Sequence, residues 1–248
     1  MVKKTVSATD TQKIVQELLQ AGAHFGHRTE RWHPKMAPFI HSARNGVHII
    51  DLIQTGDKLV TAEAKIRDIA TAGGSVLFVA TKRQAKAIVQ QAAIAAGMPY
   101  VTHRWLGGML TNWNTISGRI RHLKKLEAAR EDGSWDHLTK KERLLLEEEI
   151  ASLTKVFSGV KELSGPPAAI FIVDLTREDI AIKEANTLGI PVFAMVDTNA
   201  DPTSVEYPIP ANDDAVRSIQ YITERIAKAA ADGKAVYDAK TSSDSKEA

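Results

Sequence analysis

The chain has 248 residues, 44% of them hydrophobic, which is enough to bury the core of one large or two modest domains. It contains no cysteine, so disulfides, thiolate-bound zinc, iron–sulfur clusters and cysteine nucleophiles are excluded, in agreement with a reducing cytosol. The net charge of +2 hides an asymmetry: residues 1–130 carry 19 Lys and Arg against 8 Asp and Glu (net +11), and residues 131–248 carry 13 against 22 (net −9). This separation predicts one surface for a polyanion and another that is solvated or binds protein.

The N-terminus has no apolar segment typical of a secretion signal, and no stretch approaches the roughly 20 apolar residues of a membrane span. We therefore expect a soluble, cytoplasmic protein with no membrane partner.

The first half of the chain predicts a helix, a hairpin and a βαβ unit. A helical stripe of apolar residues over 10–21 ends at Gly22, and the Asn45-Gly46 pair predicts a tight hairpin turn inside residues 24–51. A helix over 54–72 follows, and the continuous apolar run 75–80 is typical of a parallel strand buried on both faces. A helix over 82–96 and a short strand at 100–101 complete the unit.

Residues 115–162 have a different pattern, with apolar residues that recur at alternating spacings of four and three. This heptad spacing predicts an antiparallel coiled-coil hairpin, inserted as an arm that can be removed without unfolding the rest. Glu147, Glu148 and Glu149 are expected to be solvated on its outer faces. Strands over 168–174 and 192–197 and helices over 176–188 and 213–230 then resume the alternation, which predicts an α/β fold with a doubly wound, mostly parallel sheet. The predicted domains are 1–114 with 163–230 for the α/β body, 115–162 for the arm, and 231–248 as a disordered tail.

Several enzyme classes lack their motifs. The sequence has no GxGxxG, GxxxxGK[ST], HExxH or GxSxG pattern, so a nucleotide-binding loop, a zinc protease helix and a nucleophile elbow are not predicted. Two alternatives remain open: an enzyme acting on nucleotides or phosphate esters through Asp174 and Asp197 at strand ends, and a protein-interaction scaffold working through the arm. His24, His27, His33 and His41 offer metal-ligand atoms, but without cysteine or a carboxylate motif we predict no metal and no cofactor.

Two loops, 24–51 and 103–114, combine cations with aromatic residues, as nucleic-acid surfaces do when cations neutralise phosphates and planar groups stack on unpaired bases. Trp32, His33, Trp105 and Trp113 are candidates for stacking, although each tryptophan could equally anchor the base of its loop in the core. The predicted RNA-binding residues are His24, His27, Arg28, Arg31, Trp32, His33, Lys35, Arg44, Lys82, Arg83, Arg104, Trp105, Asn112, Arg119 and Arg121. A catalytic residue is not predicted.

Over about residues 14–228 the chain closely resembles the bacterial small-subunit ribosomal protein two family. LLQAGAHFGH (18–27) is similar to the first signature of that family, and PPAAIFIVDLTREDIAIKEANTLGIP (166–191) to the second. The resemblance implies a flavodoxin-like sheet with a protruding helical hairpin, and a structural, non-enzymatic protein of the small subunit. It also implies binding to small-subunit ribosomal RNA between head and body, and to the large protein of repeated OB folds (small-subunit protein one) that helps capture messenger RNA.

Overall fold

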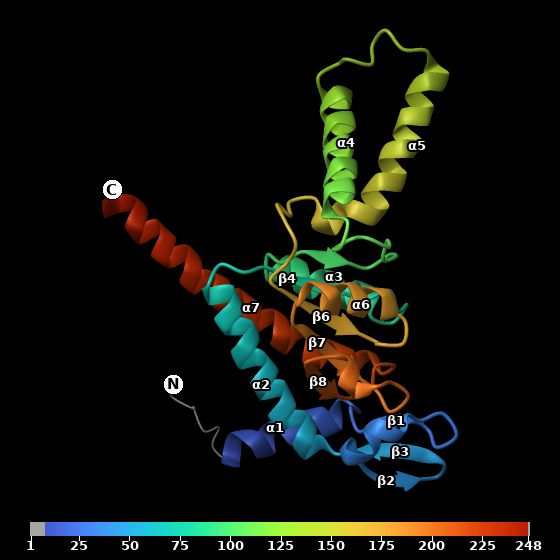
Figure 1. The fold of residues 1–248 in the computed structure, drawn as a ribbon, viewed down its shortest axis with the longest axis vertical. Helices are drawn as coiled ribbons and strands as arrows, with labels where there is room; N and C mark the ends of the chain where they lie inside the picture. Colours follow the sequence, from blue (N-terminus) through green and yellow to red (C-terminus); the bar gives the residue numbers. More distant parts are fainter. Residues whose placement is uncertain (1–7, 248) are drawn as a thin grey trace.

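Residues 8–247, which the computed structural model describes, form a parallel sheet of five strands and a smaller antiparallel sheet of three (Figure 1). The parallel sheet has the order β5-β4-β6-β7-β8. Its strands are β4 (Val76–Val79), β5 (Tyr100–Val101), β6 (Ala169–Val173), β7 (Val192–Val196) and β8 (Tyr207–Pro210). Strands β4, β6 and β7 are buried over their whole length because helices cover both faces. The predicted doubly wound α/β fold is confirmed.

Each face of the parallel sheet has its own hydrophobic core, because successive side chains of a strand point to opposite faces. The face that carries Phe78 and Phe171 packs against helices α1, α2, α3 and α7. The face that carries Leu77 and Ile172 packs against helix α6 and against the base of the arm. The helices are α1 (Ala8–Gln20), α2 (Leu52–Thr71), α3 (Lys86–Ala95), α6 (Asp179–Leu188) and α7 (Val216–Glu247).

The predicted hairpin is part of the small sheet, which consists of β1 (Phe25–Arg28), β2 (Ile40–Arg44) and β3 (Val47–Ile50) in the order β1-β3-β2. Asn45 and Gly46 both have positive φ, 53° and 75°, as the predicted turn requires. A short 3₁₀ helix, η1 (Pro34–Phe39), connects β1 and β2. The small sheet docks on the carboxyl edge of the main sheet, because the N–H groups of His27 and His33 donate to Oγ1 and the carbonyl of Thr198, which follows β7.

The arm consists of α4 (Trp113–Glu131) and α5 (Lys140–Phe157), two antiparallel helices that project from the body (Figure 1). A capping box between Thr139 and Glu142 starts α5. The heptad residues near the body are buried together with the second core: Ile116, Ile120, Leu123, Ile150 and Phe157. The base of the arm is therefore also a cover for the sheet.

In the outer part of the arm, ion pairs connect α4 to α5. His122 Nε2 lies 2.9 Å from Glu149 Oε1, and Arg130 lies 3.5 Å from Glu147 Oε2. The expectation that Glu147 and Glu149 are simply solvated is corrected. Such exposed pairs typically contribute under about 1 kcal/mol each, so the buried base is the firmer connection.

Residues 231–247 were predicted to belong to a disordered tail, but α7 continues as a helix to Glu247. Gly233 lies so close to α2 that an added Cβ would meet the carbonyl oxygen of Arg67, and the Tyr237 ring covers Gly73. Lys234 Nζ donates to the carbonyl of Gly97 at 3.1 Å. These contacts hold the helix past the predicted boundary. Residues 1–7 and 248 lie outside the described residues.

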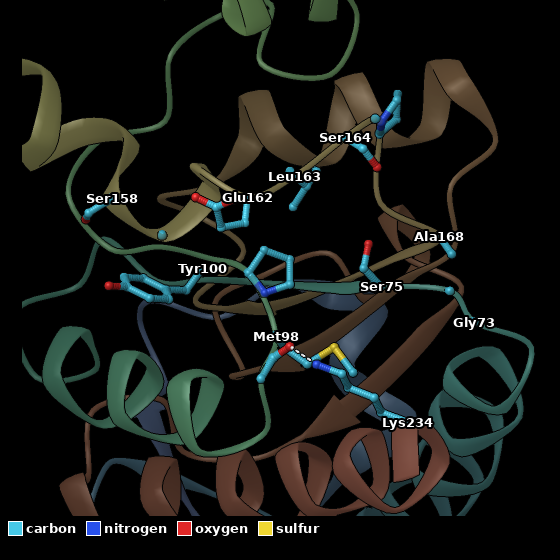
Figure 2. Close-up of a pocket in the computed structure, with 16 residues that line it drawn as sticks. Gly73, Ser75, Met98, Tyr100, Ser158, Glu162, Leu163, Ser164, Ala168 and Lys234 are labelled. Carbon is cyan, nitrogen blue, oxygen red and sulfur yellow. Dashed lines mark hydrogen bonds between the residues drawn. The ribbon is translucent and has the colours of Figure 1, made fainter. Parts of the chain in front are cut away.

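A cleft of about 670 Å³ opens at the amino edge of the sheet, between the base of the arm and α7 (Figure 2). Leu163 and Ser164 line it on the side of the arm, Met98 and Lys234 line it on the opposite side, and Tyr100 of β5 lies between them. An added Cβ on Gly159 would overlap the backbone oxygen of Tyr100, so glycine lets the end of the arm rest directly on β5. The cleft marks the junction of arm and body, at the edge opposite to the predicted RNA-binding loops.

Because the base of the arm shares the second core with the sheet, the part of the arm that can be removed is shorter than residues 115–162. We predict that replacing residues 124–149 by a short Gly-Ser linker leaves a cooperatively folded body, because Leu123 and Ile150 stay in place. Deletion of 115–162 removes the buried heptad residues as well, and we expect a loss of several kcal/mol, since each buried Ile or Phe contributes about 2–5 kcal/mol. Urea unfolding of both variants checks this; equal stability would show that the arm does not support the sheet.

Candidate nucleic-acid interface

Lys82 is the first charged residue after β4, and it lies inside the protein rather than on its surface. Its side chain is 7% exposed, and Nζ lies 2.6 Å from Asp213, 2.7 Å from Asp214 and 3.4 Å from Asp174. Burial alone would lower the pKa of Lys82, but the attraction and hydrogen bonds of these carboxylates raise it overall, so the ammonium stays charged. The prediction that Lys82 contacts phosphate is corrected: its donors are occupied by aspartates.

Lys82 and its aspartate partners form a buried charge cluster, and His27 in β1 connects this cluster to the small sheet. Its Nδ1 lies 3.0 Å from Asp197 and its Nε2 lies 3.5 Å from Asp214. The hydrogen bond to Asp197 is the main cause of a raised pKa for His27, so the protonated ring is favoured. Ligand atoms of His27, Asp197 and Asp213 lie within 4.8 Å of one another, close enough to share a cation, and Lys82 already places its ammonium against Asp213. His27 is thus directed inward.

The aspartates of the enzyme alternative belong to the same cluster. Asp174, in the left-handed region at φ 71°, accepts from the N–H and hydroxyl of Thr176, while Asp197 accepts from the N–H of Thr198. Both carboxylates therefore have internal partners, which explains their place at strand ends without any substrate.

The second predicted loop, 103–114, ends at residue 112 because α4 begins at Trp113, and it is organised by a single buried carboxylate. Glu184 of α6 is 8% exposed. It accepts hydrogen bonds from Trp105 Nε1 (3.1 Å), the N–H groups of Gly108 (2.8 Å) and Leu110 (2.9 Å), and the N–H and hydroxyl of Thr111 (both 3.1 Å). Burial alone would raise the pKa of Glu184, but these hydrogen bonds lower it overall, so the carboxylate is ionised in the folded state.

Trp105 is consequently an anchor of its loop. Its side chain is buried in the second core and its indole N–H is held by Glu184, so it has no face open to a base. The stacking prediction for Trp105 is corrected in favour of burial. Trp113 also packs, half-buried, against that core, whereas Trp32 is 40% exposed with its ring 5.3 Å from that of His48.

Most of the predicted cations lie on the surface. Exposed side chains without a salt bridge to any residue that the structure describes are Arg28, Arg31, Arg44, Arg83, Arg104, Arg119 and Arg121. Lys35 is exposed but pairs with Asp201 at 2.8 Å. Arg28 and Arg44 end strands of the small sheet and Arg31 follows β1; the next two arginines follow β4 and β5, and the last two lie on α4.

The remaining predicted residues have local roles. His33 is half-buried and its Nδ1 accepts the N–H of Lys35, which caps η1. Asn112 precedes α4, and its Oδ1 accepts the hydroxyl of Thr115 at 2.9 Å. His24 is half-buried with its ring 3.9 Å from that of Phe25.

Sequence reasoning missed Arg177 and Glu178, which directly precede α6, and Glu184 in the middle of that helix. Glu184 lies between Ile182 and Ala185 on the buried side of that helix. A charged residue inside an apolar helical stripe is the signal that was available, since a buried carboxylate needs hydrogen-bond donors from elsewhere.

Comparison with known proteins agrees with this arrangement. A model of the family described as ribosomal protein S2 matches residues 18–233. The chain belongs to the ribosomal protein S2 family. It is accordingly a structural, non-enzymatic ribosomal protein, and the phosphate-ester enzyme alternative is set aside.

The chain is similar to proteins named small ribosomal subunit protein uS2 in several bacteria. It is 52% identical to the one from Chloroherpeton thalassium over 225 residues, which cover 91% of this chain and 90% of that protein. The protein from Shewanella piezotolerans is 52% identical over 224 residues (90% and 93%), and that from Coprothermobacter proteolyticus is 51% identical over 220 residues (89% and 82%). Within residues 8–247 the structure contains no helix that meets the length and hydropathy needed to cross a membrane.

We predict that Glu184→Gln lowers the free energy of unfolding at pH 7 by about 2–3 kcal/mol, because an amide cannot accept all the hydrogen bonds that the carboxylate takes from loop 103–112. The matched control is Asp179→Asn on the same helix, an exposed partner of Lys183 whose loss should cost under about 1 kcal/mol. Urea unfolding followed by tryptophan fluorescence measures both.

The pH dependence gives a second readout of the same group. Because the folded-state pKa of Glu184 lies below its ordinary value of 4.5, the stabilisation is present above pH 4.5 and is lost as pH falls through the folded-state pKa. The difference in stability between wild type and Glu184→Gln should therefore shrink on acidification. A difference that is constant with pH would show that the charge of Glu184 is not what holds the loop.

Proposed function

We propose that this chain is a structural constituent of the small ribosomal subunit, in the cytoplasm, and binds small-subunit ribosomal RNA between head and body. The observation that carries the proposal is the set of exposed arginines without a salt bridge to any described residue, at the ends of β1 and β2, in the loop after β1, after β4 and β5, and on the arm. Long, unpaired cations on one molecule attract a polyanion, and phosphates are the groups that guanidinium binds best.

The geometry narrows the residues proposed to meet RNA. Arg28 ends β1, Arg31 lies in the loop after it, and Arg44 ends β2, whose outer residues are exposed. Trp32, between β1 and η1, is 40% exposed and Phe25, in β1, is 49% exposed, so both aromatic side chains have surface for stacking. Lys82 and Trp105 leave the proposed set because both are buried, and His27 and Lys35 are held by aspartates.

We also propose that the chain helps to dock small-subunit protein one on the subunit, as the family resemblance implies. Support comes from the charge asymmetry of the chain, since residues 131–248 carry a net charge of −9, which favours contacts with protein over contacts with RNA. The uS2 proteins to which the chain is similar are named as small-subunit proteins, which fits assembly with both kinds of neighbour.

Binding to small-subunit ribosomal RNA, or to subunits lacking this protein, over a salt series tests the proposal. We expect the log of the association constant to fall with log salt at a slope of about −3 or steeper, at roughly 0.7–0.9 per phosphate contact. Weak binding that does not change with salt would contradict an RNA-binding surface made of arginines.

A paired substitution tests the location of that surface. Arg28→Gln with Arg31→Gln should weaken binding and reduce the slope by about 1.4–1.8, since two phosphate contacts are lost. The control is Lys58→Gln with Lys65→Gln, which removes the same charge from exposed residues of α2 on the other side of the sheet. Equal effects of the two pairs would show a response to net charge alone.

A further inference from the structure

A small pocket lies at the point of the main sheet where the order of the strands reverses. From β4 the chain moves outward to β5, then returns past β4 to β6 and continues to β7 and β8. In open parallel sheets, ligands bind in the crevice outside the carboxyl ends of the two strands at this reversal. Here a pocket of about 210 Å³ opens at that place, lined by Thr81 after β4, His103 and Arg104 after β5, and Arg177, Glu178 and Ile180 after β6.

The floor of the pocket is a buried carboxylate. Glu178 is 1% exposed, and its Oε1 accepts the N–H of Thr81 at 2.8 Å. Burial raises its pKa, and the hydrogen bonds that oppose this rise come from Thr81 among the described residues. A carboxylate has about four acceptor positions, so Thr81 leaves acceptor capacity for a further donor from the pocket. No salt bridge joins Glu178 to a cation of the part of the chain that the structure describes.

The rim has the opposite charge. Arg104 is exposed without a salt bridge to any described residue, and the Arg177 side chain is 59% exposed with its Nε 3.6 Å from Asp174. Ile180 is 54% exposed and adds an apolar wall. The pocket of about 210 Å³ thus combines an acceptor at the bottom, an apolar side and cations at the entrance.

We propose that this pocket binds one unpaired guanine nucleotide of the RNA, with the base edge on Glu178 and the phosphate on Arg104 and Arg177. Guanine presents two adjacent donors, N1–H and the N2 amino group, on its Watson–Crick edge, and a carboxylate accepts such a pair side by side. Adenine and cytosine offer one amino group next to a ring nitrogen acceptor, which a carboxylate repels. Unpaired RNA bases are commonly read on that edge. A bare phosphate is disfavoured because the floor is itself anionic.

This inference rests on the proposed RNA binding, and chemical probing separates the two. Kethoxal modifies the N1 and N2 positions of unpaired guanines, so small-subunit ribosomal RNA is probed with and without the full-length protein. We expect one unpaired guanine to be protected in the wild-type complex. Glu178→Gln should restore its reactivity at least tenfold and leave the rest of the footprint unchanged, because the amide presents a donor toward guanine donors. Glu148→Gln, an exposed arm residue, is the matched control.

Each result decides one of the two proposals. Identical footprints for wild type and Glu178→Gln overturn the guanine pocket and leave RNA binding intact, whereas no footprint for the wild type overturns RNA binding. Titration of the wild-type protein with guanosine monophosphate gives a measurement that does not depend on the folding of a variant. We expect it to bind at least tenfold tighter than adenosine or cytidine monophosphate or inorganic phosphate, and Arg104→Gln, at an exposed residue, to weaken it. Equal binding of all these probes shows a phosphate contact only and overturns the base site.

Discussion

A buried ammonium group holds the carboxyl edge of the main sheet together. Lys82, after β4, pairs with Asp174, after β6, and with Asp213 and Asp214, after β8, so one side chain connects strands that are not all neighbours. Removal of one partner from a buried ion cluster leaves an uncompensated charge, which typically costs 3–5 kcal/mol. The loops at this edge therefore have little freedom, and His27 adds the small sheet to the same cluster through Asp197.

Local sequence patterns were sufficient to predict the helices, strands and turns. They were not sufficient to predict which residues pair with the buried polar groups. The apolar runs of β4, β6 and β7 and the Asn45-Gly46 turn depend on residues next to one another, and their prediction was correct. Lys82 and Asp213 are 131 residues apart, and Trp105 and Glu184 are 79 apart. In the sequence, Lys82 has the same appearance as an exposed phosphate ligand, because the carboxylates that bury it come from distant segments.

The C-terminal part of α7 and the arm show how tertiary contacts determine structure that local composition does not predict. The polar segment after residue 230 lacks an apolar stripe strong enough to predict a helix, yet Gly233 allows α7 to approach α2, and Tyr237 covers Gly73. In the arm, the heptad spacing correctly predicted which residues are buried near the body. It could not show that these residues also cover one face of the sheet, because that depends on where the arm is attached.

The carboxyl edge of the main sheet has aspartates at strand ends, as enzymes of this fold class can have, but the distribution of charge there favours binding over catalysis. Inside, each carboxylate that a phosphate-ester reaction would need is neutralised: Asp174 by Lys82 and Asp197 by His27. Outside, arginines such as Arg28 and Arg104 have no internal counter-charge among the described residues. Charges balanced within the core fix the shape of the edge, and charges unbalanced on the surface give it affinity for an extended anion. At the same edge, the proposed guanine site at Glu178 would add selectivity for a base to affinity for phosphate, since contacts with base edges carry sequence information that phosphate contacts lack.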